Sequence, residues 1–167
     1  MIPIGIAGPA GSGKTTVAEM IRLVVPDTAI VPFAKPLKDY ARRLGWNGEK
    51  DERGRRLLQL LGTDCGRMCI SENLWVDKWE KCVDADFRWC RAVIADDVRF
   101  DNEAEKITAR GGFVVRLTGR QDHTLSAEHP SERGLTVPCR AVIDNSSTLA
   151  DLSQSVFQVL REQGLVQ

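Results

Sequence analysis

The amino-acid sequence predicts an α/β fold in which a parallel five-stranded sheet is flanked by helices. Three observations carry this prediction. Short apolar runs alternate with amphipathic segments along the 167 residues, the pattern G-x-x-x-x-G-K-[ST] occupies residues 8–15, and this pattern stands between an apolar run and helix-forming sequence. Strand–helix alternation of this kind produces a parallel sheet with right-handed crossover connections.

Five apolar runs are the candidate strands. Each is a continuous stretch rich in Val, Ile and Ala and not a strict polar–apolar alternation, which is typical of strands covered on both faces. The expected strands are residues 2–7, 29–33, 92–95, 113–117 and 141–143.

Amphipathic segments between these runs are the candidate helices. The first begins inside the phosphate loop and reaches about Val25, because Pro26 cannot continue a helix. A second is expected to use Asp101 as its N-cap and to stop at Gly111. The last is expected over about 148–163, where apolar residues recur at helical spacing.

The segment at residues 8–15 predicts a nucleoside triphosphate site. Glycines allow backbone N–H groups to turn toward an anion, and the following helix directs its positive end to the same point. Lys14 is expected to reach the β- and γ-phosphates, and the Thr15 hydroxyl is expected to bind Mg²⁺. The residues expected to bind the nucleotide here are Gly8, Ala10, Gly11, Ser12, Gly13, Lys14, Thr15 and Thr16.

Two long segments interrupt the alternation, a mostly helical one at 34–91 and a polar one at 118–138. Lys35 follows a strand and could meet a second phosphate, since ligands gather at that edge of a parallel sheet, or could be a solvated lysine. The cluster Arg53, Arg55 and Arg56 suits phosphate oxygens but is equally compatible with an exposed helix face. Trp75 and Trp79 are more typical of core packing than of base stacking.

Acidic and basic residues follow the third strand and fill the polar segment. Asp97 is expected to hold the Mg²⁺ water shell or the acceptor, with Arg99 as an anion clamp, whereas Asp96 could be a turn residue. Of the basic residues in or beside the polar segment, Arg116, Arg120 and Arg133 are candidates to stabilise a transferring phosphoryl group. His123 and His129 lack the tighter ligand set that zinc requires.

Charge and composition narrow the function classes. Lys+Arg and Asp+Glu both total 23, a balance that argues against tight binding to a nucleic acid polymer. No apolar run has membrane-spanning length, and no signal peptide is evident. Five cysteines without a C-x-x-C pair indicate reduced, mostly buried thiols and a cytoplasmic location. A homodimer is compatible with these properties, as is a monomer.

A series of motifs, in order, resembles the bacteriophage deoxynucleoside monophosphate kinases over nearly the whole chain. The residues that carry the resemblance are the phosphate loop, Phe33-Ala34-Lys35-Pro36-Leu37-Lys38, Arg56-Leu57-Leu58-Gln59-Leu60-Leu61-Gly62-Thr63-Asp64, Trp75-Val76, Asp97-Val98-Arg99 with Asn102-Glu103, and His129-x-Ser131-Glu132.

The resemblance implies a P-loop kinase fold of one domain, residues 1–167, with a monophosphate-binding insertion at 34–90 and a lid at 118–138. It implies ATP as donor, Mg²⁺, and a deoxynucleoside monophosphate as acceptor. The catalytic residues would be Lys14, Asp97, Arg99 and Arg120, and the substrate-binding residues Lys35, Arg56, Gln59, Trp75, Asp97, Arg99 and Asn102. Asn145 falls where such kinases place a loop against adenine, although Asn-Asp-Gly is usual there; Asp96 stands where a small hydroxyl residue is commoner.

Two other classes remain open from the sequence. One is another small-molecule P-loop kinase, such as a dephospho-coenzyme A kinase or a general nucleoside monophosphate kinase. The other is a non-catalytic nucleotide-binding module. A GTPase is disfavoured because the chain has no Asn-Lys-x-Asp guanine signature.

Overall fold

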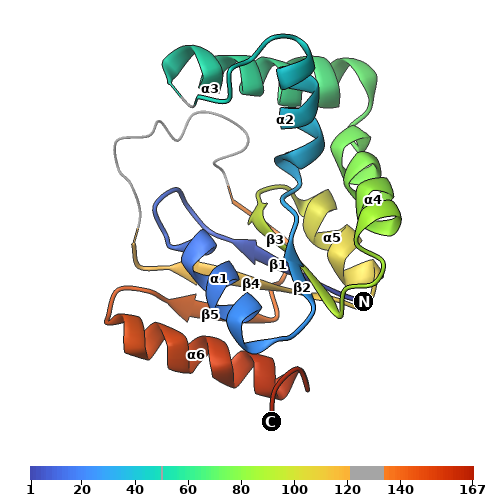
Figure 1. Cartoon of the computed structure of the whole chain (residues 1–167). Helices are drawn as coiled ribbons and strands as arrows, with labels where there is room; N and C mark the ends of the chain where they lie inside the picture. The colour runs from blue at the N-terminus through green and yellow to red at the C-terminus, as the bar shows by residue number, and fades with distance from the viewer. Residues whose placement is uncertain (50, 121–133) are drawn as a thin grey trace. The chain divides into compact units, whose positions relative to one another are not determined.

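The computed structural model describes residues 1–49, 51–120 and 134–167. These residues form two compact units: the first comprises Met1–Val31 with Trp89–Gln167, and the second comprises Pro32–Arg88 (Figure 1). The second unit covers nearly the same residues as the expected insertion at 34–90. The organisation of the chain as one domain stays a prediction.

The first unit contains the parallel sheet that the sequence predicts. Its strands are β1 (Ile2–Ala7), β2 (Thr28–Ile30), β3 (Ala92–Val98), β4 (Phe113–Thr118) and β5 (Ala141–Asp144), in the order β2-β3-β1-β4-β5 with every neighbouring pair parallel. The predicted five-stranded α/β fold is therefore confirmed. Strand β2 ends at Ile30, three residues before the expected end at residue 33, and β3 ends at Val98, three residues after the expected end at residue 95. Because β1 is the central strand, the loop that follows it leaves from the middle of the sheet edge.

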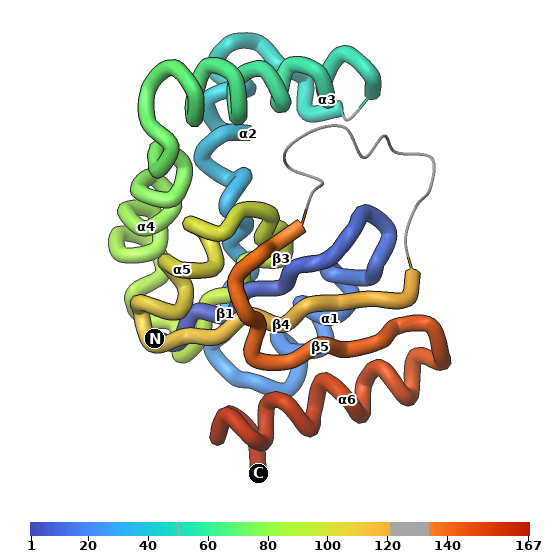
Figure 2. The backbone as a smooth tube through the Cα atoms, turned by 180° about the vertical axis from the view of Figure 1, so that it is seen from behind, coloured from blue at the N-terminus to red at the C-terminus, as the bar shows by residue number. Residues whose placement is uncertain are grey.

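Helices cover both faces of this sheet. They are α1 (Lys14–Val24), α5 (Asp101–Ala109) and α6 (Leu149–Glu162). Figure 1 shows α1 beside α6, and Figure 2, drawn from behind, shows α5 on the opposite face. Ile4 and Ile6 are fully buried in one cluster with apolar residues of α1 and α6, and each contributes about 1.5–3 kcal/mol by its burial. Between them, Gly5 faces α5: a Cβ there would lie 2.6 Å from Ile107 Cδ1.

Helix α6 begins where the sequence predicts, whereas the residue that caps α5 differs from the predicted one. Thr148 caps α6, accepting a hydrogen bond from the Asp151 N–H at 3.2 Å. The expectation that Asp101 caps α5 is wrong, since Phe100 occupies the N-cap. The Glu103 carboxylate accepts the N–H groups of Arg99 at 2.8 Å and Phe100 at 3.2 Å, which leaves the Asp101 carboxylate available elsewhere.

Asp101 instead binds the segment that leads into β5. Its carboxylate accepts the N–H groups of Thr136 at 2.8 Å and Val137 at 3.2 Å, and also the Thr136 hydroxyl. Arg116 on β4 adds a bond of 2.6 Å to the Leu135 carbonyl. The Thr136 hydroxyl, more than any other group, holds the pKa of Asp101 below its usual range.

The second unit is helical. It contains α2 (Ala34–Arg43), α3 (Glu52–Gln59), a π-helix η1 (Leu60–Ile70) and α4 (Leu74–Asp86). Asp51 caps α3 by accepting the Gly54 N–H at 2.7 Å. The unit's core includes Phe33 and Trp79, whose ring centroids lie 4.4 Å apart.

Trp75 attaches α4 to the π-helix. Its indole N–H donates to the Gly62 carbonyl at 2.7 Å, and only 8 % of the residue is exposed. Gly66 makes this approach possible, because a Cβ there would lie 2.5 Å from the indole nitrogen. The interpretation of Trp75 and Trp79 as core residues is confirmed.

The cysteines differ from expectation. All five are free, but Cys65 and Cys69 are exposed and the other three are half-buried, so the expectation of mostly buried thiols is wrong. Both exposed thiols lie on η1, where neighbouring helices do not cover them. Over the described ranges, no helix has the length and apolar content needed to cross a membrane.

Replacing Trp75 with Phe tests its bond to the π-helix. Trp75→Phe removes the donor and leaves the buried Gly62 carbonyl without this partner, so we expect the free energy of unfolding to fall by about 1–3 kcal/mol. Trp89→Phe is the matched control, because that ring is 75 % exposed and its loss should change stability by at most about 0.5 kcal/mol. Urea denaturation followed by circular dichroism measures both, and equal losses would contradict this role.

Replacing Thr136 with Val tests the contact of Asp101. The lowered pKa means that this contact stabilises the fold above the usual pKa of an aspartate, and that its contribution is lost as pH falls through the lowered value. In Thr136→Val the Asp101 pKa should rise toward its usual value but stay lowered, because two backbone donors remain. An NMR pH titration of the carboxyl group measures this. An unchanged titration in Thr136→Val would refute the assignment.

Candidate active site

The predicted phosphate loop joins the end of β1 to the start of α1. Gly13 is the N-cap of α1 with φ +92°, a left-handed conformation that favours glycine, and no acidic residue stands in the first turn of the helix. At Gly8, with φ +150°, a Cβ would lie 2.9 Å from the Leu117 carbonyl oxygen. A tightly packed glycine loop before a helix N-terminus fits a polyphosphate anion.

Lys14 lies over this loop. Its ammonium donates to the carbonyl oxygens of Gly8 at 2.9 Å and Pro9 at 2.6 Å. The cation is thereby held on the loop whose amides could bind an anion, and its charge adds to that of the helix end. This position suits the predicted contact of Lys14 with phosphate.

Thr15 is paired with Asp96, which the sequence left as a turn residue. The Thr15 hydroxyl donates to Asp96 Oδ2 at 2.9 Å, and Asp96 lies within strand β3, so the turn interpretation is wrong. The pairing of β1 and β3 changes register between Gly5↔Ala95 and Ala7↔Val98, which places one extra residue of β3 at Asp96 and Asp97. Such a bulge redirects side chains. The Thr15 hydroxyl and the Asp96 carboxylate offer the oxygen ligands that Mg²⁺ prefers.

Three predicted residues follow at the same end of β3. Asp97 lies in the strand, Arg99 directly after it, and Asn102 in the first turn of α5; all three side chains are half-buried. The bond from the Arg99 N–H to Glu103 fixes the backbone between strand and helix. The chain thus gathers an acid, a guanidinium and an amide beside β1, and their individual roles stay predictions.

Asn145 has a contact that the sequence did not suggest. It is 5 % exposed, and its side-chain Nδ2 donates to the Ser12 carbonyl at 2.9 Å, within the phosphate loop. Its own backbone N–H donates to the Thr118 carbonyl at 2.9 Å. The expected contact with adenine stays a prediction, while the structure connects this residue to the loop itself.

The expected lid is described only at its two ends. At the first end, Arg120 Nη2 donates to the Ser147 carbonyl at 3.0 Å. At the second end, residues 135–137 bond to Arg116 and Asp101, as described above. The candidates His123, His129 and Arg133 lie outside the described residues. Within the described ranges, no group of three or more His, Cys, Asp or Glu residues could hold a metal ion by itself.

An open hollow of about 410 Å³ lies along α3 in the second unit. It is lined by Asp51, Glu52, Arg55, Arg56 and Gln59, and so brings together two predicted acceptor residues, Arg56 and Gln59. Sequence reasoning missed Asp51 and Glu52 and did not separate Arg55 from its neighbours. The spacing of residues 52, 55, 56 and 59 places them on one helix face, and this pattern could have identified them.

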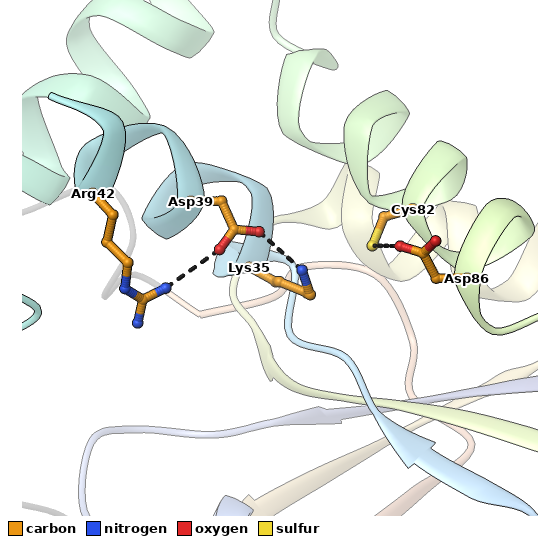
Figure 3. A network of polar contacts seen from close by, with 5 residues as sticks. All are labelled: Lys35, Asp39, Arg42, Cys82 and Asp86. Carbon is orange, nitrogen blue, oxygen red and sulfur yellow. Dashed lines mark hydrogen bonds and ion pairs between the residues drawn. The ribbon is translucent and has the colours of Figure 1, made fainter.

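Lys35 and Trp75 do not line that hollow. Lys35 Nζ forms an ion pair with Asp39 at 2.9 Å, and Asp39 also contacts Arg42 at 3.3 Å (Figure 3). This bond to Asp39 raises the pKa of Lys35, so the side chain stays cationic at neutral pH while sharing its charge. Burial raises the pKa of the nearby Cys82 thiol, whose sulfur lies 3.8 Å from Asp86. The Trp75 indole N–H donates to the Gly62 carbonyl, as described above.

Comparison with known proteins places these features in a family. The family model for deoxynucleotide monophosphate kinase matches residues 40–156. A putative deoxynucleotide monophosphate kinase of Acanthamoeba polyphaga mimivirus is 32% identical over 161 residues, covering 79% of this chain and 81% of the viral protein. The deoxynucleoside-5'-monophosphate kinase of Escherichia phage T5 is 31% identical over 87 residues, covering 48% of this chain and 34% of the phage protein.

A solved structure shows the same fold at lower identity. The tunicamycin resistance protein of Deinococcus radiodurans superposes with a TM-score of 0.59 at 15% identity, covering 99% of this chain and 96% of that one. This likeness concerns the arrangement of strands and helices, which here carry the phosphate loop, the Thr15–Asp96 pair and the arginine-lined hollow. With the family model matching most of the chain, the protein belongs to the deoxynucleotide monophosphate kinase family.

Proposed function

We propose that this protein transfers the γ-phosphoryl group of ATP to a deoxynucleoside monophosphate, with Mg²⁺, to give ADP and a deoxynucleoside diphosphate. The observation that carries the proposal is the phosphate loop with its Thr15–Asp96 pair, in a chain of the deoxynucleotide monophosphate kinase family. The names of the mimivirus and phage T5 relatives support the acceptor class.

The donor side consists of residues in the first unit. The amides of the glycine loop and the N-terminus of α1 would bind the triphosphate, and Lys14 would meet its outer phosphates. Thr15 and Asp96 would hold Mg²⁺, directly or through its water shell. When bound, this ion neutralises phosphate oxygens.

The acceptor side draws on the hollow along α3. The guanidinium of Arg56 suits a phosphate dianion, and the amide of Gln59 can donate to and accept from a base edge. Asp51 and Glu52 place two carboxylates opposite the two arginines of the hollow, and one oxygen of Asp51 also accepts the Gly54 N–H of the helix cap. We assign Arg99, Asn102 and Lys35 to the same substrate, Lys35 with its charge partly neutralised by Asp39.

The reaction needs positioning more than proton transfer. The second pKa of a phosphate monoester is about 6, so the acceptor is already largely a dianion at neutral pH. One of its oxygens forms a bond to the γ-phosphorus as the bond to the β,γ-bridging oxygen breaks, and ADP leaves with that electron pair. Lys14, Arg99 and Arg120 would stabilise the charge that shifts to the leaving oxygen, and Asp97 would orient the acceptor or water around the metal.

A coupled ADP-release assay with ATP and Mg²⁺ tests the proposal. The acceptor panel contains each deoxynucleoside monophosphate, the ribonucleoside monophosphates and dephospho-coenzyme A. Turnover with one or more deoxynucleoside monophosphates is expected and shows base preference directly. Turnover only with another acceptor would replace the proposed substrate, and ATP binding without turnover on the panel would favour a non-catalytic module.

Replacing Lys14 with Met tests the donor site. The variant keeps much of the side chain's length and loses the charge, so we expect kcat to fall by roughly 10²–10³-fold, the range seen when one charge-stabilising donor is removed. The circular dichroism spectrum should be unchanged. Full turnover in Lys14→Met would show that the phosphate loop is not where transfer occurs.

Replacing Arg56 with Ala tests the acceptor site. Arg56 lines the hollow, whereas Arg53 is exposed on the same helix and does not, so Arg53→Ala is the matched control. In Arg56→Ala the KM for the deoxynucleoside monophosphate should rise at least about tenfold, since a charge-assisted bond contributes about 1.5–3 kcal/mol. The KM for ATP should not change. Equal effects of the two variants would remove the hollow from the proposal.

A further inference from the structure

A buried amide from outside the phosphate loop bonds to the loop backbone. Asn145 follows β5, and its Nδ2 donates to the Ser12 carbonyl at 2.9 Å, across 133 positions of sequence. The Asn145 backbone is anchored as well, because its N–H donates to the Thr118 carbonyl at the end of β4. Gly119 packs against the same turn, where a Cβ would lie 2.6 Å from the Ser146 nitrogen.

The planarity of the peptide bond gives this contact a consequence for ligand binding. The Ser12 carbonyl and the Gly13 N–H belong to one peptide unit, in which they point in opposite directions. An amide that holds the carbonyl therefore also sets the direction of the Gly13 N–H, away from Asn145. Gly13 is the N-cap of α1, so this N–H is one of the loop donors available to a phosphate.

The packing around this peptide unit supports a fixed orientation. A Cβ on Gly13 would lie 2.6 Å from Asn145 Nδ2, so the amide occupies space that any other residue at position 13 would fill. Ser12 is fully buried, and among the buried side-chain polar atoms of the described residues its Oγ is the one without a hydrogen-bond partner. The Ser12 side chain contributes no bond here among the described residues, and the Asn145 amide supplies a side-chain bond that constrains this part of the loop.

We propose that Asn145 is a positioning residue for phosphate binding, acting through the Ser12–Gly13 peptide and not through the adenine base. The inference rests on the proposed function, in that the loop must bind the triphosphate. It deepens that function by separating two roles for the turn after β5. With 5 % of the residue exposed, its amide faces the loop interior, not an open base pocket.

A ligand without a base separates the two roles. The probe is inorganic tripolyphosphate with Mg²⁺, and isothermal titration calorimetry measures its affinity beside that of ATP. Asn145→Ala removes the donor without adding a charge that would itself repel a phosphate. Ser146→Ala is the matched control, because Ser146 is exposed in the same turn and its hydroxyl bonds to Asp144.

In Asn145→Ala we expect ATP and tripolyphosphate to bind more weakly by the same factor, roughly ten- to a hundredfold, the scale of a lost bond to a buried acceptor. Ser146→Ala should bind both as the unaltered protein does. In turnover, the KM for ATP should rise while the KM for the acceptor stays unchanged, which a general loss of folding would not produce.

Three results would overturn the inference. Weaker binding of ATP with unchanged tripolyphosphate would make Asn145 a contact of the base, and unchanged binding of both would leave it without a role in binding. If the unaltered protein bound neither ligand, the proposed donor site would fail and the inference with it, and this result is distinguishable from the first two. Thermal unfolding is recorded for each variant, and the neutral Asn145→Leu, which fills more of the space of the amide, replaces Asn145→Ala if the latter does not fold.

Discussion

Parallel pairing of β1 with β3 on one side and β4 on the other is the interaction on which the candidate site depends. In a parallel sheet the carboxyl ends of neighbouring strands meet at one edge, so the loop after β1 lies between the ends of two other strands. From β3 comes Asp96, which accepts the Thr15 hydroxyl, and from the β4–β5 side comes Asn145, which holds Ser12. Exchanging β1 with an edge strand would remove one of these two contacts.

The second unit organises its candidate residues by a different means. Here a helix face, set by the spacing of residues 52, 55, 56 and 59, gathers the lining of the hollow. The π-helix continues directly from α3, and Trp75 bonds to its Gly62 carbonyl. π-helices are rare and frequently occur at functional sites. The indole bond stabilises a geometry that helix propensity alone does not favour, and it does so next to the helix that carries Arg56 and Gln59.

Local signals explain which features could be predicted from the sequence. The five strands, the glycine loop and the last helix, α6, each depend on a short pattern of residues, and the structure has all of them. Asp96 and Asn145 were underestimated because their partners are 81 and 133 positions away. The extra residue in β3 is a property of its register with β1, which no pattern within β3 reveals. Asp101 was misassigned as a cap because Phe100 occupies the N-cap and the Asp101 carboxylate instead binds Thr136, 35 positions away.

Long-range hydrogen bonds to the phosphate loop reduce the conformational entropy that its glycines lose when a ligand binds. Ordering one residue of backbone costs about 1–2 kcal/mol, and glycine loses the most freedom, so a free glycine loop would have to lose that freedom when its ligand binds. Bonds from Asn145 to Ser12 and from Thr15 to Asp96 impose this order during folding, where burial of the sheet core offsets the cost. A ligand then meets donors that are already oriented, and more of the interaction energy appears as affinity. The same reasoning explains why a residue that need not touch the nucleotide can control how tightly the loop binds it.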